Sequence, residues 1–171
     1  LRTTNVPVFE QPRFVTSTEP PATFDSLVSD PVEVLGAISA AMHAYDAEWT
    51  RLEQEYRAKI EDWDTRYGRE YSEDQQKLRD ETARFDRGLE IIRADVDVQL
   101  AFRLTNQSFV GNPQKPAWRL FQIVFLVSQI PGLAALKTGH EGDLRDRQHV
   151  DIIYFPTGGG KTEAYLGVIV F

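Results

Sequence analysis

"PVEVLGAISAAMHAYDAEWTRLEQEYRAKIEDWDTRY", residues 31–67, carries a large apolar side chain at every third or fourth position. This near-heptad spacing predicts a long amphipathic helix, because residues three and four apart share one helix face. Asp30, Pro31 and Glu33 form a helix-start signal of N-cap, first-turn proline and capping-box acid. At about 1.5 Å per residue the helix would be roughly 55 Å long. The apolar stripe consists of Leu35, Ile38, Met42, Tyr45, Trp49, Leu52, Tyr56, Ile60, Trp63 and Tyr67.

A second helix is expected from Ser72 to about Leu104, opened by a capping box of Ser72 and Gln75. The "YGRE" break between the two helices contains Gly68, whose permissive backbone suits a turn. The sequence therefore predicts a helical hairpin over residues 31–112, preceded by an extended, proline-rich segment (1–30) and followed by a third region (113–171). The stripe of the second helix consists of Leu78, Phe85, Leu89, Ile92 and Val96.

The predicted hairpin is acidic. Residues 32–112 hold 17 Asp or Glu and 11 Lys or Arg, a net charge of −6. This charge disfavours a direct grip on nucleic-acid phosphates. The hairpin is interpreted as a structural scaffold. The alternatives are an arm that docks a protein partner and an arm that guides or gates nucleic acid. Trp63, Tyr67 and Tyr71, near the turn, are expected to be exposed anchors for a partner.

The composition of the 171-residue chain, 42% hydrophobic and 26% charged, indicates a folded protein. Its net charge of −7 argues against electrostatic nucleic-acid binding by this segment alone. The absence of cysteine favours a reducing cytosol. No signal-peptide pattern opens the sequence, and the longest apolar run, "LFQIVFLVSQI", is too short to span a bilayer. We therefore expect a soluble, cytoplasmic protein with no membrane partner.

The C-terminal third has the order of elements that a phosphate-binding loop requires. "PAWRLFQIVFLVSQIPGL" (116–133) predicts a buried helix that ends before Pro131. "VDIIYF" (150–155) has the profile of a buried parallel strand, and the glycine-rich "PTGGGKT" (156–162) leads from it into the helical pattern "EAYLGVIVF". A strand, a glycine loop and a helix in this order predict a nucleotide site.

Each residue type in the glycine loop has a chemical role. Backbone N–H groups of Gly158, Gly159 and Gly160 can turn toward phosphates, and the helix N-terminus adds its dipole. The Lys161 ammonium would reach the β- and γ-phosphates as a catalytic contact, and the Thr162 hydroxyl would ligate Mg²⁺. ATP with Mg²⁺ is therefore the expected cofactor. The strict P-loop pattern requires glycine at position 155, where this chain has phenylalanine.

The form "PTGGGKT" resembles motif I of superfamily-two helicases, in which the first glycine is commonly replaced. The resemblance implies that Thr157 belongs to the nucleotide-binding loop. In many such motors a glutamine in an Arg-x-aromatic-Gln setting precedes motif I and reads the adenine edge. "WRLFQ" matches this arrangement, so the resemblance implies that Arg119 and Gln122 contact the nucleotide. A purely structural glutamine on a helix face is the alternative.

Three segments together are similar to the large helicase-like subunit of the DISARM anti-phage defence systems: "FDRGLEIIRADVDVQLAFRLTNQSF" (85–109), "PAWRLFQIVFLVSQIPGL" and "DIIYFPTGGGKTEAYLG" (151–167). The resemblance implies an ATP-dependent DNA translocase that acts with a partner subunit, and it implies that this chain is an N-terminal portion of that motor.

The fold class expected is α/β, a long helical hairpin leading into the first strand, P-loop and helix of a RecA-like parallel-sheet lobe. Phosphoryl transfer also needs a water-orienting acid and further transition-state charge stabilisation, and no acidic Walker B box follows the loop here. This chain alone is therefore expected not to hydrolyse ATP. The rival hypothesis is a helical interaction module whose P-loop binds nucleotide only as a switch.

Overall fold

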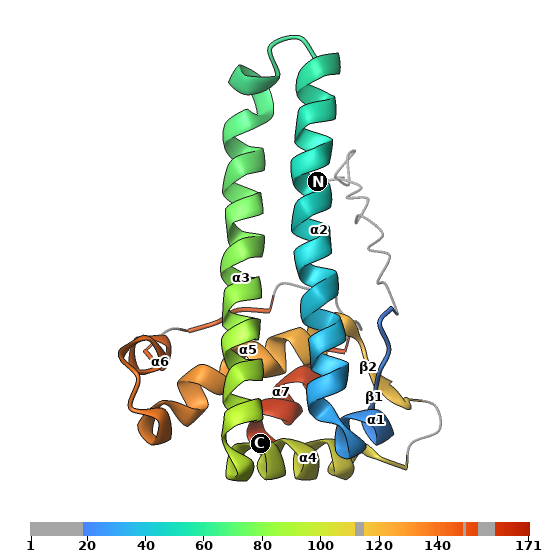
Figure 1. Ribbon diagram of the computed structural model, residues 1–171, viewed down its shortest axis with the longest axis vertical. Helices are drawn as coiled ribbons and strands as arrows, with labels where there is room; N and C mark the ends of the chain where they lie inside the picture. The colour runs from blue at the N-terminus through green and yellow to red at the C-terminus, as the bar shows by residue number, and fades with distance from the viewer. Residues whose placement is uncertain (1–18, 112–114, 149, 154–159) are drawn as a thin grey trace, which may run out of the picture.

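A long antiparallel hairpin of two helices stands on a base of shorter helices (Figure 1). The computed structural model describes residues 19–111, 115–148, 150–153 and 160–171. α2 and α3 form the hairpin, and the other helices gather at its open end. In chain order the elements are β1 (Ala22–Thr23), α1 (Phe24–Ser29), α2 (Pro31–Lys59), the π-helical turn η1 (Asp64–Gly68), α3 (Arg69–Ala94), α4 (Val96–Phe109), β2 (Ala117–Trp118), α5 (Leu120–Thr138), α6 (Glu141–Asp146) and α7 (Lys161–Val170).

The expected α/β class with a RecA-like parallel sheet was wrong. Across the described ranges the structure is helical, and its one sheet is the antiparallel pair β1–β2, in which Ala22 lies opposite Trp118. Residues 150–153, from the expected strand, are not in strand conformation. β-branched residues form a strand only where a neighbouring strand takes up their backbone groups. Here α3 and α5 hold the segment through the side chain of Asp151 instead.

Two helix starts are set by aspartate caps. The Asp30 carboxylate accepts a hydrogen bond from the Glu33 N–H at 3.1 Å, and Pro31 occupies the first turn of α2, which confirms the predicted start. Asp95 separates α3 from α4 and accepts from the N–H of Val98 at 3.2 Å. The second predicted helix is therefore two helices, because this cap starts a new helix before Leu104.

The turn of the hairpin lies earlier than expected. α2 ends at Lys59, and the chain reverses over residues 60–63, where Asp62 adopts a φ of 60°. Aspartate tolerates this left-handed conformation better than most residues do. Gly68, the expected turn residue, has a helical φ of −57° and lies at the end of η1, which leads directly into α3.

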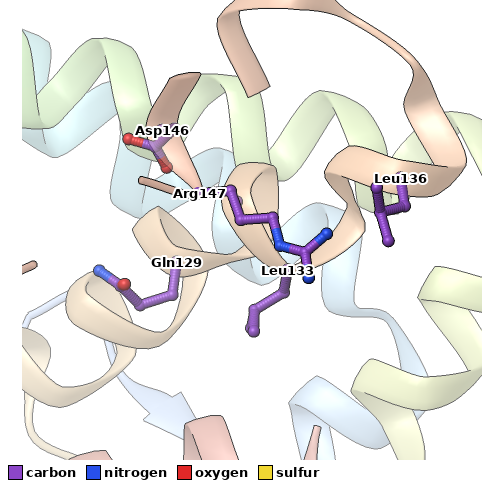
Figure 2. A pocket seen from close by; sticks show the side chains of 6 residues that line it. Gln129, Leu133, Leu136, Asp146 and Arg147 are labelled. Atoms are coloured by element: carbon purple, nitrogen blue, oxygen red, sulfur yellow. The ribbon is translucent and has the colours of Figure 1, made fainter. Parts of the chain in front are cut away.

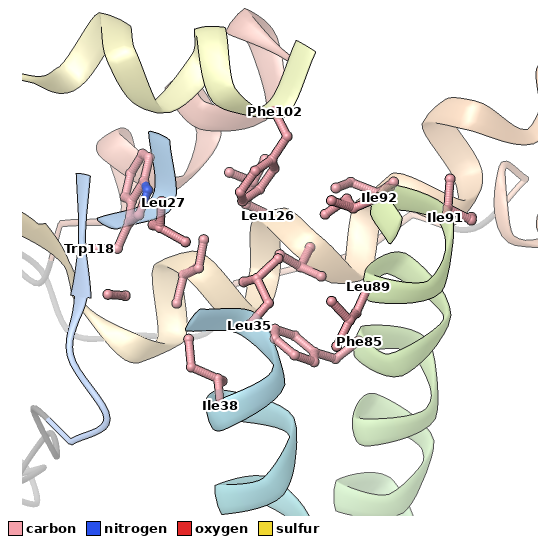
Figure 3. Close-up of a cluster of buried hydrophobic side chains, with 14 of the residues drawn as sticks. Leu27, Leu35, Ile38, Phe85, Leu89, Ile91, Ile92, Phe102, Trp118 and Leu126 are labelled. Atoms are coloured by element: carbon pink, nitrogen blue, oxygen red, sulfur yellow. The ribbon is translucent and has the colours of Figure 1, made fainter. Parts of the chain in front are cut away.

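The hydrophobic core lies where the open end of the hairpin meets the shorter helices (Figure 3). α2 and α3 contribute to it only from their halves nearest the base, and α5 packs against α3 there. This packing attaches the hairpin to the helix that carries the predicted adenine contact. The division of the chain into three regions, with boundaries after residues 30 and 112, stays a prediction. Core residues shown in Figure 3 include Leu27, Leu35, Ile38, Phe85, Leu89, Ile92, Phe102, Trp118 and Leu126.

The outer half of the hairpin is held by aromatic rings. Trp63 lies at the centre of this aromatic cluster, with ring centroids 5.3 Å from Tyr56, 5.4 Å from Tyr67 and 5.5 Å from Tyr71. Tyr71 also packs on Trp49 at 4.8 Å. The expectation of an exposed anchor was wrong for Trp63, which is only 7% exposed, because the early turn folds it between the two helices.

α5 continues through Pro131 to Thr138, so the expected end before the proline was also wrong. A proline inside a helix cannot donate to the carbonyl four residues earlier, which here belongs to Val127. That carbonyl lies against Gly88 of α3, and the ring of Pro131 is buried. α3 therefore lies directly over the carbonyl that Pro131 leaves without its usual donor, and α5 ends at Gly139, which has a φ of 64°.

α5 is also long and apolar enough to cross a membrane by length and composition. Its 19 residues include an 18-residue window of mean hydropathy 1.6, and no other helix of the described chain meets this test. Half of that window is buried inside the protein, where α5 contacts α3, α6 and α7. A core helix has the same character, so α5 gives no indication of a membrane protein. The cytoplasmic location stays a prediction.

Candidate nucleotide-binding site

The N-terminus of α7 carries the described part of the predicted phosphate loop. Gly160 caps the helix with a φ of 89°, a left-handed conformation that favours glycine. Lys161 and the exposed Thr162 are the first two residues of the helix. Backbone N–H groups in the first turn of a helix have no intrahelical acceptor, so they can bind an anion. Thr157, Gly158 and Gly159 lie outside the described residues.

Gln122 links the two predicted motifs directly. Its side-chain amide donates a hydrogen bond to the Gly160 carbonyl at 2.7 Å, and its amide oxygen accepts one from the Arg119 N–H at 2.8 Å. The side chain is 5% exposed, and a Cβ added to Gly160 would lie 2.6 Å from its amide nitrogen. The structure thus brings together Arg119, Gln122 and Gly160, three of the predicted site residues.

A cation that the sequence analysis missed lies at the same helix end. Lys115 forms an ion pair with Glu163, in the first turn of α7. The Lys115 ammonium lowers the pKa of the Glu163 carboxyl below its usual value, and the backbone N–H of Glu163 and the nearby Arg119 act in the same direction. Because 48 positions separate Lys115 from Glu163, no local pattern could have paired them.

The segment that leads toward the glycine loop is held by a second group of side chains, which we call the Asp151 cluster: Asp151, Arg84, Gln129 and Asp146. Arg84 of α3 donates to both carboxylate oxygens of Asp151, at 2.9 and 2.8 Å. Gln129 of α5 donates to the same carboxylate at 2.9 Å. Arg84 also pairs with Asp146 at 3.1 Å. No local sequence pattern indicates this cluster, because its residues belong to four separate segments of the chain.

A pocket of about 240 Å³ between α5 and the end of α6 borders this cluster (Figure 2). Gln129 and Asp146 line it together with Leu133, Leu136 and Arg147. No group of three or more His, Cys, Asp or Glu side chains within the described ranges could hold a metal ion.

Comparison with known proteins connects part of the chain to a defence protein. Fifty-four residues, 32% of this chain, are 50% identical to the DISARM protein DrmA of Bacillus paralicheniformis. The matched stretch spans 4% of the length of that relative. No family model and no solved structure matches the chain. The match supports a relationship to DISARM defence proteins, as the sequence resemblance predicts.

Proposed function

We propose that this chain is part of an anti-phage defence protein of the DISARM type and that the N-terminus of α7 binds the phosphates of ATP. The match to the DISARM protein DrmA supports the first part. One observation carries the second: a left-handed Gly160 starts α7 so that Lys161 and Thr162 occupy its first two positions. Phosphate binding at such a helix start uses backbone N–H groups of the first turn together with a lysine.

In this proposal Lys161 contacts the β- and γ-phosphates and the Thr162 hydroxyl ligates Mg²⁺. Mg²⁺ with the triphosphate would supply charge neutralisation at the γ-phosphate. Lys115 has a supporting role, because it neutralises the Glu163 carboxylate, which would otherwise repel a phosphate at this helix end. Arg119 adds a further positive charge next to Glu163.

The adenine contact of Gln122 is part of the same proposal. Both ends of its amide bind protein groups, the Gly160 carbonyl and the Arg119 N–H. Contact with adenine would require the amide to exchange at least one of these bonds for the base. Burying an amide without a hydrogen bond is costly, so the Gln122 amide would bind either the base or the Gly160 carbonyl. Binding of the base would in this way affect the position of Gly160.

For the longer protein we propose a superfamily-two helicase or translocase that couples ATP hydrolysis to movement on DNA, together with a partner subunit of the defence complex. The acidic hairpin would repel phosphates. We therefore propose that the hairpin contacts a protein rather than DNA. The helical architecture favours a second candidate, an interaction module in which the nucleotide acts only as a switch. ATP turnover by the longer protein supports the motor, and nucleotide binding without turnover supports the switch.

Binding of a fluorescent ATP analogue, mant-ATP with Mg²⁺, to this chain tests the nucleotide site. Lys161→Ala removes a charge-assisted contact and is expected to weaken binding by about tenfold or more. Lys77→Ala is the matched control, because Lys77 is an exposed lysine on α3 that pairs with Asp74 in its own helix. Equal binding by the wild-type and Lys161→Ala chains would refute the proposed site.

A further inference from the structure

Two glutamines of α5 bind the residues at the two ends of the stretch 151–160, which we call the glycine-rich segment. Gln122 binds the carbonyl of Gly160 at 2.7 Å, and Gln129 binds the carboxylate of Asp151 at 2.9 Å. The glutamines are seven positions apart, so they lie on the same face of the helix, about 10 Å from each other. α5 thus fixes where the segment from residue 151 to residue 160 begins and where it ends.

Arg84 connects the beginning of this segment to the hairpin. Its guanidinium makes a two-pronged contact with Asp151, and the two side chains are 25% and 28% exposed. Such paired contacts orient both partners, because two parallel hydrogen bonds fix their relative rotation. The Asp151 carboxylate is therefore held by two helices at once, α3 through Arg84 and α5 through Gln129.

The joint between α3 and α5 is tight at the same level. One turn after Arg84, Gly88 of α3 lies directly against the Val127 carbonyl of α5. A displacement of α3 at this contact is not absorbed by side chains, since there is none at Gly88. α3 also runs without a break over 26 residues from the hairpin turn to its base. Movement of the hairpin would thus reach Asp151 through Arg84.

We propose that the Asp151 cluster is a positioning element that ties nucleotide affinity at Gly160 and Lys161 to the placement of the hairpin helix α3. This inference rests on the proposed nucleotide binding. Arg84 and Gln129 touch no nucleotide in it; they act through Asp151, which sets the start of the glycine-rich segment. Because coupling between two sites is reciprocal, nucleotide binding would in turn strengthen the attachment of α3.

The first test measures the dissociation constant of mant-ATP with Mg²⁺ for the folded chain. Arg84→Gln is expected to raise it by about fivefold or more, the usual size of such coupling. Arg84→Lys should restore part of the affinity, because it keeps the charge and loses the paired geometry. Gln129→Ala is a milder variant, because it removes only one hydrogen bond to the Asp151 carboxylate. Circular dichroism confirms that each variant is folded at the temperature of the measurement.

Arg87→Gln is the matched control. Arg87 lies one position before Gly88 and makes an equally paired contact, at 3.0 and 2.8 Å, with Asp143 of α6, not with the glycine-rich segment. The Arg87→Gln variant should have a lower free energy of unfolding and an unchanged dissociation constant for mant-ATP. Wild-type affinity in Arg84→Gln and Gln129→Ala would overturn the inference. An equal loss of affinity in Arg84→Gln and Arg87→Gln would also overturn it, because the effect would then be general destabilisation.

Hydrogen exchange separates this inference from the proposed function. Without nucleotide, Arg84→Gln should speed amide exchange in α7 beyond its first turn, where the N–H groups are hydrogen-bonded within the helix, and Arg87→Gln should not. If the wild-type chain shows no binding that depends on Lys161, the proposed function fails, and exchange at α7 then decides whether the Asp151 cluster positions the segment. Unchanged exchange in Arg84→Gln would refute the positioning role.

Discussion

Gly88 of α3 lies so close to the Val127 carbonyl of α5 that a Cβ at position 88 would be 2.2 Å from the oxygen. Pro131, four positions after Val127, cannot donate an N–H to that carbonyl. The two features belong together: the proline leaves a helix carbonyl without its usual donor, and the glycine lets α3 approach it. The hairpin is attached to the base at this contact.

Gly88→Ala is therefore expected to lower the free energy of unfolding by about 3 kcal/mol or more, since the added methyl group meets a backbone atom that cannot move aside. Gly36→Ala is the control, because Gly36 of α2 has no atom within 4 Å of an added Cβ. That change should stabilise the helix by up to about 1 kcal/mol. Urea denaturation measures both, and similar values for the two variants would contradict the close crossing.

The aromatic cluster predicts a local response at the end of the hairpin. Trp63→Ala should destabilise the turn by about 3 kcal/mol, because it removes a buried ring packed against three others. Tyr67→Ala should cost less, since Tyr67 is 41% exposed. Amide hydrogen exchange near residues 60–71 reads out the difference. Slower or equal exchange in Trp63→Ala, compared with Tyr67→Ala, would show that the ring is not central to the turn.

The pair between Arg87 and Asp143 predicts a dependence of stability on pH. Hydrogen bonds from Arg87 lower the pKa of Asp143 against the opposing effect of burial, and Thr138 contributes in the same direction as Arg87. A carboxyl whose pKa is lower in the folded chain stabilises the fold above its unfolded pKa of about 3.9, and this stabilisation is lost as the pH falls through the folded value.

Asp143→Asn should therefore lower the free energy of unfolding by roughly 2 kcal/mol at pH 7, with a difference from wild type that shrinks below about pH 4. Denaturant melts from pH 7 to pH 3 measure the difference. Glu141→Gln, in the same helix but 90% exposed, should have almost no effect at pH 7. A difference for Asp143→Asn that persists unchanged at pH 3 would rule out this carboxylate as the source.

Gln122→Ala separates two roles for the buried amide. If Gln122 reads adenine, the variant should lose about tenfold in affinity for ATP and much less for GTP, which relaxes base discrimination. If Gln122 only positions Gly160, affinity for both nucleotides should fall together. Competition of ATP and GTP against mant-ATP measures the ratio. An unchanged preference for ATP would remove the adenine contact and leave the phosphate site intact.

The parts of the fold that were predicted correctly depend on neighbours in sequence. The stripe from Leu35 to Tyr56 and the cap at Asp30 are local signals, and the long helix α2 follows from them because helices form through contacts three and four residues apart. The helix expected after the glycine loop, α7, is local in the same sense. The strand expected at residues 150–155 does not form in its described part, 150–153, because a strand depends on a distant partner.

The sequence by itself determined that this protein has two long helices, where α2 begins and that a helix follows the glycine loop. Only the tertiary structure decided that Gln122 meets Gly160 and that Arg84 meets Asp151, pairs separated by 38 and 67 positions. The physical reason is the distance along the sequence over which each interaction acts. Caps and apolar stripes act within a few residues, whereas these hydrogen bonds exist only because packing of α3 against α5 brings remote side chains within reach.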